Sequence, residues 1–180
     1  PESMHGVFPV MKKYGGAAIA LTLDENGIPQ TAQGRLDVAK KIIRTAATYG
    51  IDKQDLIVDG LAMAVSTGGD NGRVALETLS RARSELGVST VLGVSNISFG
   101  LPSRLQVNQA FMTMAIASGL SVAIINPQLP EMRSAFYGLP GLHSPLCPAA
   151  RPRPGGGIRG IVPAPGGAAR HEAAGASRRA

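Results

Sequence analysis

The chain has 180 residues, 44% of them hydrophobic, with one Cys, no Trp and no run close to the roughly 18 apolar residues of a membrane span. This composition indicates one cytoplasmic domain, or part of one, without an internal disulfide or a cysteine-based zinc site. The net charge of +6 lies entirely in residues 133–180, whereas residues 1–132 hold eleven bases and eleven acids, which argues against a nucleic-acid-binding core. The first ten residues lack the basic and apolar regions of a signal peptide, and we expect no membrane partner.

Four apolar segments of strand length alternate with three segments of helical spacing. Strands are predicted at Ala17–Leu23, Leu56–Asp59, Thr90–Val94 and Ser121–Ile125, and helices at Thr31–Tyr49, Gly72–Leu86 and Ser103–Ser118. Glycine commonly ends a helix, and Gly50, Gly87 and Gly119 follow the three predicted helices. The third helix begins with the spacing of a capping box, Ser103 and Gln106.

This alternation predicts an α/β fold with a parallel sheet that is buried on both faces. Two architectures stay open on this pattern alone, a doubly wound sheet and a (β/α)8 barrel, and both bind ligands at the carboxyl ends of their strands. The repeat of about 33 residues is close to the βα unit of a barrel. We expect the domain to cover residues 1–137. An Arg-, Pro- and Gly-rich disordered tail, interpreted as non-native rather than as a binding arm, follows over 138–180.

Polar side chains follow every predicted strand. In Ser89–Gly100 (STVLGVSNISFG) a buried strand runs directly into Ser95 and Asn96, the strongest ligand-binding candidates of the chain. The other three strands lead to carboxylate or amide side chains, namely Asp24, Asp59 and Asn126. A carboxylate can accept two parallel N–H bonds from an amidine-like edge, such as that of a pterin, and an amide can donate and accept at once. The strand ends therefore suggest a site for a flat heterocycle.

Ordinary turn chemistry is the competing interpretation at these positions. It is favoured at Asp24, which precedes Glu-Asn-Gly, and at Asn126, which precedes Pro127. Ligand binding is favoured at Asp59 over capping of the next turn, and at Asn96 over bonding to loop backbone. No histidine follows a predicted strand, which disfavours metal-dependent hydrolysis and Ser-His catalysis, and no metal site is predicted.

Four strings occur in order over about residues 7–132: KKYGGAAIALTLDENGIP, LIVDGLAMAVSTG, GVSNISFGLPSR and AIINPQ. Together they resemble the pterin-binding barrel family. Within it they are most similar to the methyltetrahydrofolate:corrinoid methyltransferases, which include the folate domain of cobalamin-dependent methionine synthase, and less similar to dihydropteroate synthase. The resemblance implies a (β/α)8 TIM barrel of which this chain is the C-terminal half, four βα units.

The same resemblance implies roles for individual residues. Asp59 matches the family acid that hydrogen-bonds the pterin, and Asn96 matches an asparagine near the methyl-bearing pterin nitrogen, which makes it the catalytic candidate. Further pterin-binding positions are implied at Gly93, Ser95 and Phe99 and, less securely matched, at Asn126 and Asp24.

The implied chemistry is methyl transfer from methyltetrahydrofolate to the cobalt of a corrinoid (cobalamin), which a separate domain or protein presents. A tertiary amine leaves only if it gains a proton or a strengthening hydrogen bond, and an asparagine amide supplies such a bond without titrating. Because the resemblance covers half a barrel, we expect the chain alone to bind folate weakly and to be inactive. A dihydropteroate synthase-like enzyme, disfavoured by the IINP strand end, a non-catalytic pterin-binding module and a homodimer stay open.

Overall fold

The computed structural model describes residues 2–137, so the tail predicted over 138–180 lies outside the described residues. Within this range four short strands alternate with helices. In chain order these elements are α1 (Glu2–Tyr14), β1 (Ala18–Leu21), α2 (Ala32–Thr48), β2 (Leu56–Asp59), α3 (Asn71–Arg81), β3 (Ser89–Gly93), α4 (Arg104–Ala117), β4 (Val122–Ile124) and α5 (Pro130–Tyr137). Shorter helical turns are η1 (Lys53–Asp55), η2 (Ala82–Leu86) and η3 (Val94–Ser98).

The predicted strands and helices are confirmed, and two further helices, α1 and α5, were not predicted. All three helix-ending glycines have positive φ, as their position predicts. Helix α1 was missed because it contains Gly6 and Pro9, which are poor helix formers. Its stability comes from packing, since Phe8 and Met11 are buried against residues of α2 and β2. The other unpredicted helix, α5, packs on α4.

The capping box predicted at the start of α4 is wrong. Ser103 has a left-handed backbone, with φ +53°, and its side chain makes no capping hydrogen bond. A capping side chain needs an extended backbone that aims its oxygen at the first turn, and here Gln106 N donates to the main-chain oxygen of Ser103 instead (3.1 Å). Thr31 shows the working arrangement, because its extended backbone lets Oγ1 accept from Gly34 N at 3.1 Å.

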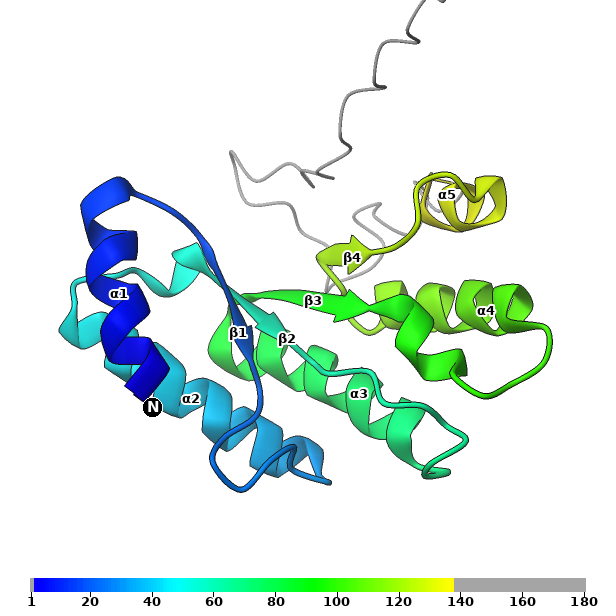
Figure 1. Ribbon diagram of the computed structural model, residues 1–180, viewed down its shortest axis with the longest axis horizontal. Coiled ribbons are helices and arrows are strands. Elements are labelled where there is room, and N and C mark those ends of the chain that lie inside the picture. Colours follow the sequence, from blue (N-terminus) through cyan, green and yellow to red (C-terminus); the bar gives the residue numbers. More distant parts are fainter. Residues whose placement is uncertain (1, 138–180) are drawn as a thin grey trace, which may run out of the picture.

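The strands form one parallel sheet in the order β1-β2-β3-β4. Asp59 of β2 lies in register with Leu21 of β1 and Val91 of β3. Figure 1 shows α2, α3 and α4 side by side along one side of this sheet. A doubly wound sheet reverses its strand order and carries helices on both faces. The sequential order and the one-sided helices of the described residues are consistent with part of a barrel.

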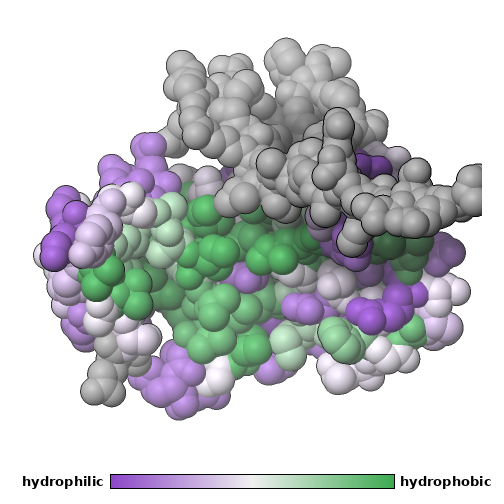
Figure 2. Space-filling view, turned by 45° about the horizontal axis from the view of Figure 1, so that its top comes forward, coloured by the Kyte–Doolittle hydropathy of each residue, from purple (hydrophilic) through white to green (hydrophobic). Residues whose placement is uncertain are grey.

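The two faces of the sheet differ in cover. On one face, here called the covered face, Leu56, Val58 and Leu92 are fully buried beneath the helices. The alternate strand residues point to the opposite face, here called the open face. Its edge strands expose large apolar side chains: Ile19 by 50%, Leu21 by 46% and Ile124 by 52%. An apolar surface is visible across the middle of the molecule in Figure 2. The prediction of burial on both faces is therefore wrong for the edge strands, because none of the described helices covers the open face.

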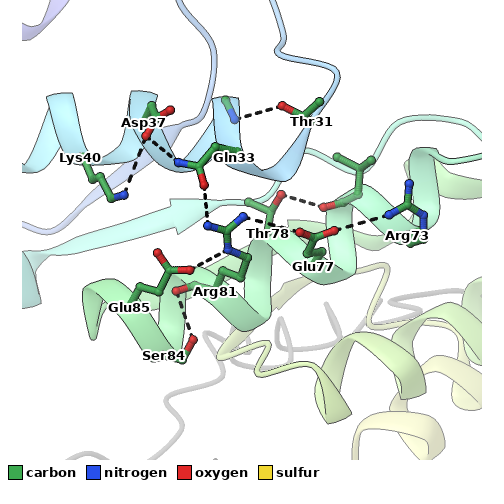
Figure 3. Close-up of polar contacts among 12 residues, drawn as sticks. Thr31, Gln33, Asp37, Lys40, Arg73, Glu77, Thr78, Arg81, Ser84 and Glu85 are labelled. Atoms are coloured by element: carbon green, nitrogen blue, oxygen red, sulfur yellow. Dashed lines mark hydrogen bonds and ion pairs between the residues drawn. The ribbon is translucent and has the colours of Figure 1, made fainter.

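Helices α2 and α3 are also joined at their surface by polar side chains (Figure 3). Arg81 of α3 donates to Gln33 Oε1 of α2 at 2.6 Å and to Glu85 at 2.6 Å. Gln33 lies in the first turn of α2, so its bond to Arg81 holds that turn against α3. Within residues 2–137, no helix combines the length and hydropathy that a membrane crossing requires.

Candidate functional site

The loops that follow β2 and β3 are bonded to each other. Val65 N donates to the main-chain oxygen of Ile97 at 3.0 Å, and Ser66 Oγ donates to that of Phe99 at 2.7 Å. Because β2 and β3 are neighbouring parallel strands, the two loops form one continuous edge at their carboxyl ends.

Asp59 is the last residue of β2 and points to the open face, yet it is only 8% exposed. Its Oδ1 accepts a hydrogen bond from Leu61 N at 2.8 Å. Oδ2 accepts no hydrogen bond from the residues that the structure describes. Burial raises the pKa of the Asp59 carboxyl above its usual value, opposed by the Leu61 N–H and by the charge of Arg35. A desolvated carboxylate with spare acceptor capacity at a strand end is typical of a binding site.

Arg35 lies in the first turn of α2 and is 1% exposed. Its Nε donates to the main-chain oxygen of Pro29 at 3.0 Å, and its Nη1 donates to those of Gly60 (2.7 Å) and Leu61 (2.9 Å). Burial lowers the pKa of the guanidinium, whereas the charge of Asp59 raises it. No sequence pattern pointed to Arg35, because an arginine in the first turn of an amphipathic helix is usually a solvated residue.

Asn96 lies in η3, directly beyond β3, and is exposed. A Cβ at Gly93 would lie 3.0 Å from Asn96 Nδ2, so the glycine leaves room for the amide over the end of the strand. Gly93 shares a face of β3 with Val91, the register partner of Asp59. The structure therefore brings Asp59 and Asn96 to the carboxyl ends of neighbouring strands, with the amide over the same face as the carboxylate.

Ser95 and Phe99 lie in the same loop, and both are exposed. The main-chain oxygen of Ser95 accepts from Arg104 Nη2 at 3.0 Å and from Ser98 Oγ at 3.2 Å. The guanidinium carbon of Arg104 lies 4.6 Å from the centroid of the Phe99 ring. Arg104 thus fixes the loop that carries Asn96, a role that its place at the end of the string GVSNISFGLPSR did not predict.

Asp24 and Asn126 show the turn chemistry that the sequence favoured. Asp24 Oδ1 accepts from Asn26 N at 2.8 Å, and Asn126 Oδ1 accepts from Gln128 N at 2.9 Å. Asp59 makes the same bond to the residue two positions on, but it differs in being buried and in lying beside a buried cation. Among the described residues, no three His, Cys, Asp or Glu side chains gather as a metal ion would require.

This geometry agrees with what comparison with known proteins finds. The family model described as pterin binding enzyme matches residues 3–126, a range that holds every candidate site residue named above. The chain belongs to the pterin-binding enzyme family. The family resemblance carried by the four sequence strings is thereby confirmed.

Individual proteins with similar sequences show which members of the family this chain resembles. The chain is 35% identical to methionine synthase of Mycobacterium tuberculosis (strain ATCC 25618 / H37Rv) over 136 residues, 70% of this chain and 11% of that protein. It is 36% identical to methionine synthase of Mycobacterium leprae (strain TN) over 126 residues, 65% of this chain and 10% of that protein. It is 26% identical to methylcorrinoid:tetrahydrofolate methyltransferase of Eubacterium limosum over 170 residues, 79% of this chain and 62% of that protein. The chain thus spans about a tenth of the methionine synthases and less than two thirds of the methyltransferase.

Proposed function

We propose that this chain forms the C-terminal half of a (β/α)8 pterin-binding barrel and acts in methyl transfer between methyltetrahydrofolate and a corrinoid. Sequential parallel strands with helices on one face support the barrel. The names of the relatives support the reaction, since they are methionine synthases and a methylcorrinoid:tetrahydrofolate methyltransferase. In this proposal the open face of the sheet is the barrel interior, and its carboxyl end holds the pterin.

The observation that carries the proposal is the buried carboxylate of Asp59. The amino-pyrimidinone edge of a pterin presents two parallel N–H groups, which match the two oxygens of a carboxylate. Leu61 N occupies one acceptor site of Oδ1, so Oδ2 and the second lone pair of Oδ1 remain for the ligand. Because Asp59 is already desolvated, two N–H donors from a ligand would replace solvation that folding has removed.

Asn96 is the proposed group at the reacting nitrogen. In the transfer, the electron pair of the acceptor cobalt forms a bond to the methyl carbon while the bond from that carbon to the pterin nitrogen breaks. The bonding pair stays on the nitrogen, which becomes more basic as the methyl leaves and takes up a proton from solvent to give tetrahydrofolate. An amide N–H directed at this nitrogen is worth more in the transition state than in the ground state, and the amide does not change its charge with pH.

The methyl acceptor in this proposal is a corrinoid presented by another domain or protein, with folate as the small-molecule partner. The exposed loop around Ser95 and Phe99 borders the proposed pterin site. It therefore belongs to the surface that a corrinoid would approach.

Binding of methyltetrahydrofolate to the 180-residue chain tests the carboxylate. We expect backbone NMR shifts at Asp59, Leu61 and Asn96, at millimolar ligand if binding is as weak as the sequence suggests. Asp59→Asn presents an N–H to the ligand in place of one acceptor, and it should weaken binding about tenfold, since a lost charged hydrogen bond costs about 1.5 kcal/mol. The matched control is Asp52→Asn, because Asp52 makes the same local bond, to Gln54 N, at the opposite end of β2. Unchanged affinity of Asp59→Asn would overturn the assignment.

Turnover separates an enzyme from a binding module. The chain is joined to the complementary half of a related barrel and given methyltetrahydrofolate and cob(I)alamin. We expect methylcobalamin to form, and we expect Asn96→Ala to slow its formation at least tenfold with a smaller effect on folate affinity. Folate binding by the joined protein without methyl transfer would favour the non-catalytic module instead.

A further inference from the structure

Arg35 is a buried cation whose hydrogen bonds all end on main-chain oxygens. They join the loop before α2, at Pro29, to the segment after β2, at Gly60 and Leu61. No carboxylate of residues 2–137 lies within ion-pair distance of this guanidinium. A buried charge is costly unless it is paired and hydrogen-bonded, and an apolar residue would fill this position more cheaply. The free-energy cost of burying Arg35 is therefore explained by the backbone segments that its guanidinium holds in place.

The held segment has an unusual backbone. Leu61 has φ +51°, and a left-handed conformation costs a side-chain-bearing residue roughly 1–2 kcal/mol. Two hydrogen bonds fix it: its oxygen accepts from Arg35 Nη1, and its N–H donates to Asp59 Oδ1. The strained residue is therefore the link between the guanidinium and the carboxylate. Strain of this kind persists where surrounding contacts impose it, and it gathers at functional sites.

Gly60 belongs to the same hydrogen-bonded segment, and core side chains pack closely against it. A Cβ at Gly60 would lie 3.1 Å from Leu79 Cδ2 and 3.3 Å from Leu92 Cδ2, so the backbone is pressed against the core. Thr22 Oγ1 donates to the main-chain oxygen of Asp59 at 2.8 Å. Asp59 is thus fixed through its backbone by Thr22, through its side chain by Leu61, and through the next peptide by Arg35.

We propose that Arg35 is the positioning residue for the pterin-recognition carboxylate: it imposes the left-handed Leu61 backbone that orients Asp59. This inference rests on the proposed function for the ligand, but the link from Arg35 through Leu61 to Asp59 does not depend on it. The direction of the pKa effects agrees, since the charge of Arg35 opposes the rise that burial causes in the pKa of Asp59.

Two substitutions separate charge from geometry. Arg35→Gln removes the charge and most of the donors, whereas Arg35→Lys keeps a buried cation without the planar fork that reaches two carbonyls. Arg44→Gln is the matched control, because Arg44 is an exposed arginine of the same helix. In the full 180-residue chain, the Asp59 carboxyl is titrated by ¹³C NMR, and the Leu61 amide is followed as the reporter of the orienting bond.

We expect Arg35→Gln to raise the Asp59 titration midpoint further and to move the Leu61 amide upfield, because its hydrogen bond to the carboxylate loosens. Arg35→Lys should restore most of the midpoint but not the amide position, and Arg44→Gln should change neither. Methyltetrahydrofolate affinity should fall about tenfold in Arg35→Gln at neutral pH, with a smaller loss at higher pH.

A folded Arg35→Gln or Arg35→Lys chain with the wild-type midpoint and the wild-type Leu61 amide would overturn the inference. If Arg35→Gln fails to fold, the Leu61 amide in Arg35→Lys still decides it. If the wild-type chain shows no folate binding in its titration, the proposed ligand is wrong, yet the Asp59 and Leu61 readouts still test the role of Arg35.

Discussion

The covered and open faces of the sheet are built from alternate residues of the same short strands, and they have different tasks. In β2, Val58 points to the covered face and is fully buried, whereas its neighbour Asp59 points to the open face with a desolvated carboxylate. The covered face stabilises the chain by apolar packing. The open face combines exposed apolar side chains on its edge strands with polar groups at its carboxyl end. Adjacent positions thus separate stability from recognition, so substitutions on the two faces should have different effects.

The largest difference is expected between two strand leucines. Leu92 of β3 is fully buried on the covered face, and Leu21 of β1 is nearly half exposed on the open face. Leu92→Ala should lower the free energy of unfolding by about 3 kcal/mol, within the usual range for a buried leucine, and Leu21→Ala by about 1 kcal/mol or less. Urea unfolding followed by circular dichroism measures both. Equal losses would show that the open face also contributes to the stability of this chain.

A smaller difference should separate the two helix starts. Thr31 caps α2 through its side chain, whereas Ser103 makes no such bond at the start of α4. Thr31→Ala should cost about 1 kcal/mol of unfolding free energy, and Ser103→Ala close to nothing. Thermal unfolding of the two variants beside wild type gives the comparison. A loss in Ser103→Ala that matched the loss in Thr31→Ala would contradict the cap assignment.

The smallest effect on stability, and the one most specific to the open face, concerns pH. The pKa of Asp59 is raised in the folded chain, so folding favours its protonated form. The resulting stability is present below the usual aspartate value of 3.8 and is lost as the pH rises through the higher folded pKa. Asp59→Asn should remove this decrease in stability with rising pH, and the variant should be at least as stable as wild type at neutral pH. The prediction fails if the two proteins show the same dependence of the urea midpoint on pH.

Much of the fold and part of the candidate site could be predicted from the sequence, because they depend on local residue patterns. Apolar strands, amphipathic helices and terminal glycines gave the α/β alternation, and polar residues after each strand placed Asp59 and Asn96 at the same edge. Arg35 could not be predicted, since its role depends on main-chain oxygens 25 and 26 residues away. The exposure of the open face could not be predicted either. A strand residue is apolar in the sequence whether or not another part of a protein packs on it.

Titration of the ¹³C-labelled Asp59 carboxyl, with and without methyltetrahydrofolate, tests most directly whether this carboxylate recognises the pterin. The free chain should show an Asp59 pKa above the usual value, because burial disfavours its charge. Saturating methyltetrahydrofolate should lower that pKa, since the two N–H donors of the pterin favour the ionised form, and affinity should rise with pH over the same range. A bound complex in which the Asp59 pKa stays where it was in the free chain would contradict the assignment of this carboxylate to pterin recognition.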